Sequence, residues 1–395
     1  MSQVSDRLAS LSPSETLAMS QKSNELKAQG IDIINLSVGE PDFFTPEHIK
    51  AAAKKAIDDN FSFYSPVPGY MDLRKAICSK LKNENNLDFT PEQIVVSNGA
   101  KQSICNAILC IVNPGDEVII PAPCWVSYVE MVKLAEGKSV VIPSGIENDF
   151  KITPAQLEAA ITPKTKAIIL CSPSNPTGSV YSHDELKALA DVLAKYPQVI
   201  ILADEIYEHI NYIGGHQSIA QFENVRERVA IINGVSKAYA MTGWRLGYAC
   251  GPRKIIEQMT KLHQYAIMCA PTTSQYAAVE ALRNGDDDVA MMREAYNQRR
   301  RYLVHAFKEM GLECFEPYGA FYIFPCIKEF GMTSEEFASR FLMEEKVAVV
   351  PGTAFGDCGE GFLRISYAYS LENLKEALGR MQKFIDRLRE EQKDK

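Results

Sequence analysis

Lys237 occupies a position where an ionisable side chain is costly. It follows the apolar run 229–233 and lies in the stretch 234–247, GVSKAYAMTGWRLG. Burying an unpaired ammonium group is unfavourable, but a lysine with a lowered pKa can form a Schiff base with a carbonyl compound. Ser236 and Arg245 would then donate hydrogen bonds to a phosphate group nearby. The alternative is a solvated loop lysine together with an arginine in an ordinary ion pair.

A glycine turn joins an expected strand to an expected helix at residues 97–102, SNGAKQ. Gly99 allows a tight turn, and the free backbone N–H groups at the start of the helix, at Ala100 and Lys101, can bind a phosphate. Turns of this kind are common in α/β proteins, so a turn with only a structural role is the alternative.

Two more polar side chains follow apolar strands. Asn175 lies in the segment 172–178, SPSNPTG, and is either a structural turn residue or an amide donor. Asp204 ends the apolar run 199–203 and precedes the residues EIY. A carboxylate is rarely buried unless it is paired, so Asp204 is either a helix N-cap or the partner of a protonated ring nitrogen, whose pKa it would raise.

Trp125 and Arg364 are each open to two interpretations. Trp125 follows an expected strand, where an indole packs in the core or stacks on a ligand. Arg364 alternates with apolar residues on a short expected strand, so it is either solvated or placed to bind a carboxylate through both arms of its guanidinium group.

The stretch 234–247, the segment 175–178 (NPTG) and the segment 204–207 (DEIY) together resemble the class I and II aminotransferases, which are pyridoxal phosphate (PLP) enzymes of fold type I. The resemblance extends from about Thr16 to the last expected helix. It implies that Lys237 holds PLP as a Schiff base and moves the substrate proton. The other cofactor contacts implied are the phosphate ligands Ala100, Lys101, Ser236 and Arg245, the ring contacts Trp125 and Asp204, and the donors to the phenolic oxygen, Asn175 and Tyr207.

The resemblance also implies a substrate side of the site. Arg364 would bind the substrate α-carboxylate beside Gly39, Trp125 and Asn175. Lys101 and Thr16 would hold a distal carboxylate, as in the aspartate-type subgroup. Two further positions matter: Tyr64 would reach the cofactor phosphate of the partner in a homodimer, and Ser12 stands where some relatives linked with prephenate use have a basic residue, which disfavours prephenate.

The expected activity is a ping-pong transfer of the amino group from aspartate to 2-oxoglutarate, giving oxaloacetate and glutamate. An alanine, aromatic or prephenate aminotransferase, or a PLP lyase on the same fold, is the main alternative. An aminotransferase-like transcription regulator is a remote one, because we expect no DNA-binding unit before Thr16.

Composition limits the class of protein. The chain has 395 residues, 46% hydrophobic and 23% charged, with a net charge of −8, as in ordinary globular proteins. It has no basic run typical of nucleic-acid binding and no histidine spacing typical of a metal site. Ten scattered cysteines without a CxxC pair, no apolar run of membrane-spanning length and no signal-peptide pattern predict a soluble cytoplasmic protein.

Alternating apolar runs and helical patterns predict an α/β fold, with a large domain whose mainly parallel sheet is covered by helices on both faces. A smaller α+β domain follows, to which the first residues return. We expect residues 1–43 as an N-terminal arm and the first part of the small domain, 44–284 as the large domain and 285–395 as the rest of the small one. Thr45 is the expected N-cap of a helix to about Asp59, residues 347–350 an expected strand, and residues 387–395 an expected frayed end.

Overall fold

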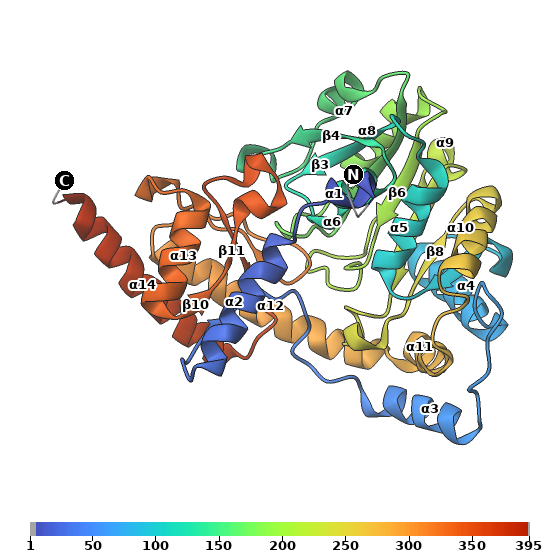
Figure 1. The fold of residues 1–395 in the computed structure, drawn as a ribbon, viewed down its shortest axis with the longest axis horizontal. Coiled ribbons are helices and arrows are strands. Elements are labelled where there is room, and N and C mark those ends of the chain that lie inside the picture. Colours follow the sequence, from blue (N-terminus) through green and yellow to red (C-terminus); the bar gives the residue numbers. More distant parts are fainter. Residues whose placement is uncertain (1–4, 394–395) are drawn as a thin grey trace.

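The computed structural model describes residues 5–393, and its largest sheet has seven strands in the order β2-β8-β7-β6-β5-β3-β4 (Figure 1). Neighbouring strands from β4 to β7 pair in parallel, whereas β8 is antiparallel to both β2 and β7. The predicted mainly parallel sheet is therefore confirmed. Its strands are β2 (Ile94–Ser97), β3 (Glu117–Ala122), β4 (Lys138–Pro143), β5 (Thr165–Cys171), β6 (Ile200–Asp204), β7 (Val229–Gly234) and β8 (Gly247–Cys250).

Helices cover both faces of this sheet, because its strands are apolar on both sides. In β6, Ile201 and Ala203 join one hydrophobic core and Leu202 joins the other. A strand buried on both faces needs such a continuous apolar run. The first core includes α3 (Glu47–Asp58), α4 (Met71–Asn85), α7 (Pro154–Ala160), α8 (His183–Ala194), α9 (Glu223–Arg226) and α11 (Thr272–Asn284); the second includes α5 (Ala100–Ile111), α6 (Ser127–Leu134) and α10 (Arg253–Ala266).

A second unit lies beside the large sheet, on the left in Figure 1. Its three-stranded antiparallel sheet has the order β11-β12-β9, and β1 near the N-terminus pairs in parallel with β10. The elements are β1 (Ile34–Asn35), β9 (Tyr322–Ile323), β10 (Val347–Ala348), β11 (Val350–Pro351), β12 (Leu363–Ser366), α2 (Glu15–Ala28), α12 (Asp286–Glu309), α13 (Ser334–Glu345) and α14 (Leu371–Lys393).

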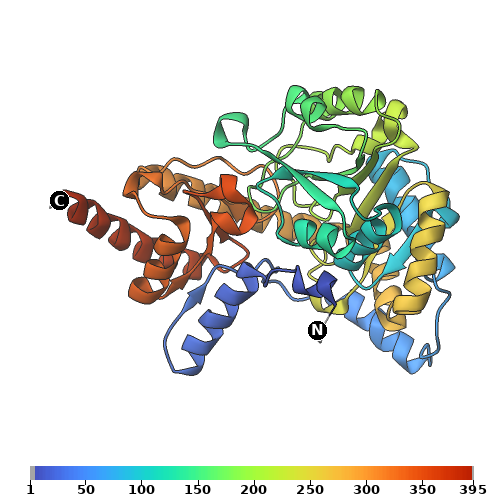
Figure 2. The same cartoon turned by 45° about the horizontal axis from the view of Figure 1, so that its top comes forward.

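Helix α12 joins the two units. Val289 in its first turn belongs to the core of the large sheet, whereas Met292 and Leu303 belong to the core of the second unit. The short helix α1 (Asp6–Ala9) contacts α6, and the backbone N–H of Ser12 donates to Glu130 at 2.8 Å, so the start of the described chain lies against the large sheet's helices (Figure 2). The domain limits 1–43, 44–284 and 285–395 remain predictions.

Three details of the sequence-based prediction are wrong. Thr45 does not cap α3, because its hydroxyl donates to the Ala240 carbonyl and the N-cap is Pro46. Residues 347–350 form two short strands, β10 and β11, which pair with different partners. The predicted frayed end is helical as far as Lys393, since Leu388 is buried in the core and neighbouring arginines form ion pairs with other elements. Residues 394–395 lie outside the described part.

Among residues 5–393, no helix combines the length and the apolar character needed to cross a membrane.

Gly247 provides a test of how the large sheet positions the start of α5. A Cβ atom at Gly247 would lie 2.2 Å from the backbone nitrogen of Ala100. We expect Gly247→Ala to lower the free energy of unfolding by about 1–3 kcal/mol, because backbone atoms on two packed elements would have to separate. Urea denaturation measures this loss.

Gly379→Ala is the matched control, because a Cβ atom at this position on α14 would meet nothing within 4 Å. We expect this substitution to stabilise the protein by about 0.5–1 kcal/mol, the helix-propensity difference between the two residues. Equal effects of the two substitutions would contradict the close approach at Gly247.

Candidate active site

A cavity of about 350 Å³ lies at the carboxyl ends of β6 and β7, facing the second unit. Strand β6 contributes Asp204, the segment after β7 contributes Lys237, and β12 contributes Arg364. This edge of a parallel sheet is where α/β proteins commonly bind ligands. Every predicted site residue except Tyr64 lines the cavity: Thr16, Gly39, Ala100, Lys101, Trp125, Asn175, Asp204, Tyr207, Ser236, Lys237, Arg245 and Arg364.

Lys237 follows β7 and has no carboxylate as a direct partner in the described chain. Its Nζ donates a hydrogen bond to the carbonyl oxygen of Gly39 at 2.8 Å. Removal from bulk water lowers the pKa of Lys237 to about 8, and the positive charges of Arg364 and Arg245 act in the same direction. An amine with this pKa is partly neutral near physiological pH, which is the form that attacks a carbonyl group.

Asp204 ends β6 and is 4% exposed. The hydroxyl of Tyr128 donates to Oδ2 at 2.6 Å, and the backbone N–H of Ile206 donates to Oδ1 at 3.2 Å. Burial raises the pKa of Asp204 to about 6, although these two hydrogen bonds favour the ionised form. A cationic group bound in the cavity would lower this pKa again, and the carboxylate would in turn keep that group protonated.

One end of the cavity is suited to an anion. Gly99 precedes α5 with a φ of +88°, and a Cβ atom there would lie 2.5 Å from Nη2 of Arg245. The guanidinium group is held by hydrogen bonds to the carbonyls of Thr242 at 2.8 Å and Asn98 at 3.2 Å. The first backbone N–H groups of a helix have no partner within the helix. The N–H group of Ala100, at the start of α5, is therefore available to a phosphate.

Arg364 lies on β12 and is 3% exposed, so the alternative of a solvated, outward-facing arginine is wrong. Its guanidinium group donates to Asn175 Oδ1 at 3.2 Å and to the Ser37 carbonyl, and it lies over the rings of Tyr322 and Phe355. Its Nε is buried without a partner in residues 5–393. A buried, unpaired donor of this kind is matched by a carboxylate ligand.

A second cation, Lys101, lines the cavity. Its Nζ lies 4.8 Å from the centre of the Trp125 ring, and burial lowers its pKa. Thr16 also lines the cavity, with its hydroxyl 2.9 Å from that of Ser14. The cavity therefore has two separate groups, Arg364 and Lys101, that can bind anionic ends of a ligand.

Two tyrosines of the site were not identified from the sequence. Tyr128 lies three residues after Trp125 and packs edge-on against it at 5.3 Å, so the i, i+3 spacing could have indicated it. The hydroxyl of Tyr322 lies 2.8 Å from that of Tyr207. Nothing in the sequence links these last two residues, because they are distant in the chain and meet only through packing of the second unit.

Tyr64 is 81% exposed and does not line the cavity within this chain. Its contact with the cofactor phosphate of a partner chain remains a prediction.

The family model of class I and II aminotransferases matches residues 31–381. The chain belongs to this family. The aspartate/prephenate aminotransferase of Cereibacter sphaeroides is 48% identical over 397 residues, which cover 97% of this chain and 99% of that protein.

Two solved aminotransferase structures are also similar. Aspartate aminotransferase from Thermus thermophilus with maleate has a TM-score of 0.93 and 41% identity, covering 97% of this chain and 100% of that one. Aromatic aminotransferase from Pyrococcus horikoshii has a TM-score of 0.88 and 42% identity, covering 92% and 99%. The predicted fold type I architecture is thereby confirmed.

Class I and II aminotransferases use PLP. The cavity fits the three reactive parts of this molecule: an amine at Lys237 for the aldehyde, a buried carboxylate at Asp204 for the ring nitrogen, and the start of α5 with Arg245 for the phosphate. The glycine at position 99 keeps space open beside Arg245. Which side chain contacts which cofactor atom remains a prediction.

The buried carboxylate predicts a stability gain on neutralisation. The pKa of Asp204 is about 6 in the fold and 3.8 ordinarily, so the folded state binds more protons between these values and loses stability as pH rises through them. We expect Asp204→Asn to stabilise the cofactor-free aminotransferase at pH 8 by up to about 3 kcal/mol, since one pKa unit is about 1.4 kcal/mol.

Urea denaturation of both cofactor-free proteins at several pH values measures the difference in their free energies of unfolding. The difference should vanish as the pH falls below about 4, because Asp204 is then protonated in the folded and in the unfolded protein alike. Equal stabilities at pH 8 would mean that the Asp204 carboxylate is not destabilised by burial.

Proposed function

We propose that this aminotransferase transfers the amino group of aspartate to 2-oxoglutarate, with Lys237, Asp204 and Arg364 in the roles below. The observation that carries the proposal is that Arg364 and Lys101, two cations from different units, line the same cavity as the Lys237 amine. Aspartate, glutamate and their oxo acids each have two carboxylates, so two cationic groups around one amine suit them. Aspartate is named as a substrate in the names of both the T. thermophilus and the C. sphaeroides relatives, and the name of the second also includes prephenate.

The chemistry supplied by bound PLP is an electron sink that stabilises negative charge at the substrate Cα. Arg364 binds the α-carboxylate through the donors that the fold leaves free and so orients the Cα–H bond. The neutral amine of Lys237 would accept the proton from the substrate Cα and would return it on the cofactor side. Holding one base within reach of both positions supplies orientation together with acid–base transfer.

Three side chains that would contact the cofactor, those of Asp204, Asn175 and Tyr207, support this role of Lys237, and each is held by further hydrogen bonds. The ionised Asp204 favours a protonated ring nitrogen, and Tyr128 and the Ile206 amide favour the ionised Asp204. Asn175 uses its Oδ1 to accept from Arg364, which leaves its amide nitrogen to donate to the cofactor's phenolic oxygen. Tyr207 donates to the same oxygen and is held in place by Tyr322.

The proposal also includes an oligomeric state, a homodimer, and a compartment, the cytoplasm. Phe63 and Tyr64 are 80% and 81% exposed, and large apolar side chains gathered on a surface typically lie in an interface. Ten free cysteines suit a reducing compartment. Sedimentation of the purified protein tests the dimer, and a fully active monomer would contradict the role of Tyr64.

The function is tested by following the visible absorbance of purified protein with PLP. We expect it to bleach on addition of aspartate and to return with 2-oxoglutarate, whereas Lys237→Ala should bind PLP without the Schiff-base absorbance and lose nearly all turnover. Rates with aspartate, alanine, tyrosine and prephenate separate the alternatives. The similarity to the P. horikoshii aromatic aminotransferase makes tyrosine one competitor, and the name of the C. sphaeroides relative makes prephenate another. A poor rate with aspartate would overturn the substrate assignment.

Lys101→Ala tests how the distal carboxylate is read. We expect kcat/KM for aspartate to fall by about 10- to 100-fold, the effect of losing a hydrogen bond to a charged group, while kcat/KM for alanine changes little. The Lys101 backbone amide is unchanged, so phosphate binding should persist. Arg364→Ala is the comparison, and it should weaken aspartate and alanine alike. Equal losses with the two substrates for Lys101→Ala would mean that another group binds the distal carboxylate.

A further inference from the structure

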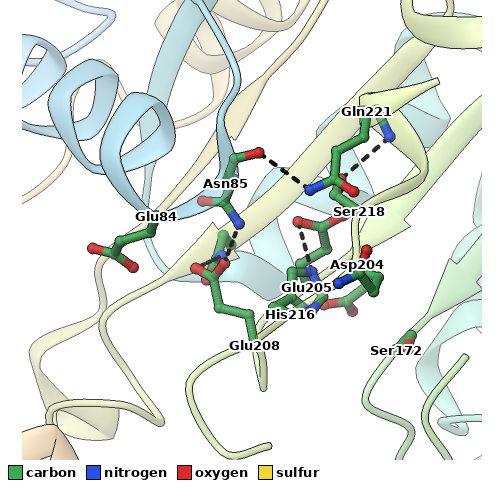
Figure 3. A network of polar contacts seen from close by, with 12 residues as sticks. Glu84, Asn85, Ser172, Asp204, Glu205, Glu208, His216, Ser218 and Gln221 are labelled. Atoms are coloured by element: carbon green, nitrogen blue, oxygen red, sulfur yellow. Dashed lines mark hydrogen bonds and ion pairs between the residues drawn. The ribbon is translucent and has the colours of Figure 1, made fainter. Parts of the chain in front are cut away.

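A buried network of charged and polar side chains lies behind the cavity wall, between α4, the segment after β6 and the end of β7 (Figure 3). At its centre are Lys80 of α4 and Glu208, whose side chains are 0% and 3% exposed and form an ion pair. Neither lines the cavity. We call this group the buried network; its members are Lys80, Asn85, Glu205, Glu208, His216, Ser218 and Asn233.

Glu208 accepts hydrogen bonds from three donors. Asn233 donates to Oε1 at 2.6 Å, Asn85 donates to Oε2 at 3.0 Å, and Lys80 donates to Oε1. Lys80 also donates to Asn85 Oδ1 at 2.7 Å. Every oxygen of this carboxylate is therefore matched by a specific donor, as a buried ion pair requires.

Glu208 lies close in the chain to Asp204 and bonds to a residue close to Lys237. The segment 204–208 carries Asp204 and Tyr207 on the cavity side, and the Glu208 amide donates to the Glu205 carbonyl at 2.9 Å within the same turn. Asn233, which bonds to Glu208, is in β7, four residues before Lys237. Glu208 thus ties the segment that carries Asp204 to the segment that carries Lys237.

Other charged groups surround the pair. Glu84 lies 3.7 Å from Lys80, and His209 lies 3.8 Å from Glu208. On the other side, Glu205 accepts from Ser218 at 2.6 Å and lies 3.2 Å from His216. Burial acts to raise the pKa of Glu208, but the positive charge of Lys80 holds it well below its usual range. The carboxylate is therefore ionised and remains a strong acceptor.

We propose that Glu208, paired with Lys80, is a positioning residue that fixes the separation between the Asp204 carboxylate and the Lys237 amine through its bond to Asn233. The inference rests on the proposed function, in which these two groups hold opposite ends of PLP. Small displacements of reacting groups reduce rates strongly, so the tie matters for turnover without touching substrate.

Asn233→Ala tests the tie, because it removes the bond to Glu208 and leaves the Lys80–Glu208–Asn85 cluster complete. It also removes the bond that Asn233 Oδ1 accepts from the Gly234 amide at 2.7 Å, so the test of Glu208 below is needed beside it. We expect kcat of the holoenzyme to fall about tenfold with little change in KM for aspartate. We expect the dissociation constant Kd for PLP to rise about tenfold. We also expect a changed midpoint in the pH titration of the bound cofactor's absorbance. Leu193→Ala, a core truncation in α8 away from the cavity, is the control: it lowers thermal stability but leaves these cofactor properties unchanged.

A swap of the amide and the carboxylate tests the role of Glu208 itself. Glu208→Gln leaves Lys80 without its nearest counter-charge and sets two amide groups against each other, so stability and PLP affinity should fall. Adding Asn85→Asp restores the charge and every donor–acceptor match. The carboxylate introduced at position 85 accepts from Lys80 and from the amide introduced at position 208, whose oxygen accepts from Asn233. The double variant should therefore recover most of both properties.

The outcomes distinguish this inference from the proposed function. A wild-type protein that does not bind PLP or transfer amino groups would overturn the proposed function. A wild-type protein that does both, with Asn233→Ala matching it in PLP affinity, absorbance midpoint and kcat, would overturn the positioning role alone. A Glu208→Gln/Asn85→Asp variant no better than Glu208→Gln would equally contradict the proposed role of Glu208.

Discussion

The burial of two groups of opposite charge, the Asp204 carboxylate and the Lys237 amine, sets the requirements that the other elements of this structure meet. The Asp204 carboxylate has a raised pKa and the Lys237 amine a lowered one because both lie in a cavity that replaces solvent with protein. Each group is therefore poised to gain from a ligand that offers it a partner. Under the proposed function, bound PLP would supply these partners, an aldehyde for Lys237 and a protonated ring nitrogen for Asp204.

The strands of the large sheet and the hydrogen bonds around them position Asp204 and Lys237. Asp204 ends β6 and Lys237 follows the neighbouring parallel strand β7, so the sheet brings the two side chains to the same cavity. Tyr128 and Gly39 contact them directly through hydrogen bonds. Behind the wall, the buried network joins the same two chain segments. Contacts on both sides of the wall restrain the segments more than either set could alone, which is what a site for precise proton transfer needs.

Under the proposed function, substrate recognition depends on residues from both units. Arg364 belongs to the small antiparallel sheet and Lys101 to the helix after β2, so neither unit has a complete site for a dicarboxylate. Arg364 is buried among Tyr322, Phe355 and Asn175, and these contacts hold its planar guanidinium group in place. Lys101 is a point charge without the planar fork of an arginine, so under the proposed function it would select less strictly at the distal end of a substrate.

The sequence by itself determined the parallel sheet and the strand–turn–helix at Gly99, because strand periodicity and turn residues are local in the chain. A contiguous motif also predicted Lys237 as the reactive lysine, and the structure places this residue in the cavity. The sequence did not determine that Thr45 bonds to Ala240 instead of capping α3, that residues 347–350 split between two partners, or that the C-terminal helix continues to Lys393. Tertiary structure alone brought Tyr128 to Asp204, Tyr322 to Tyr207, and Lys80 and Asn233 to Glu208. Those pairings join residues far apart in sequence, and their energies come from burial and hydrogen-bond matching that exist only once the elements have packed.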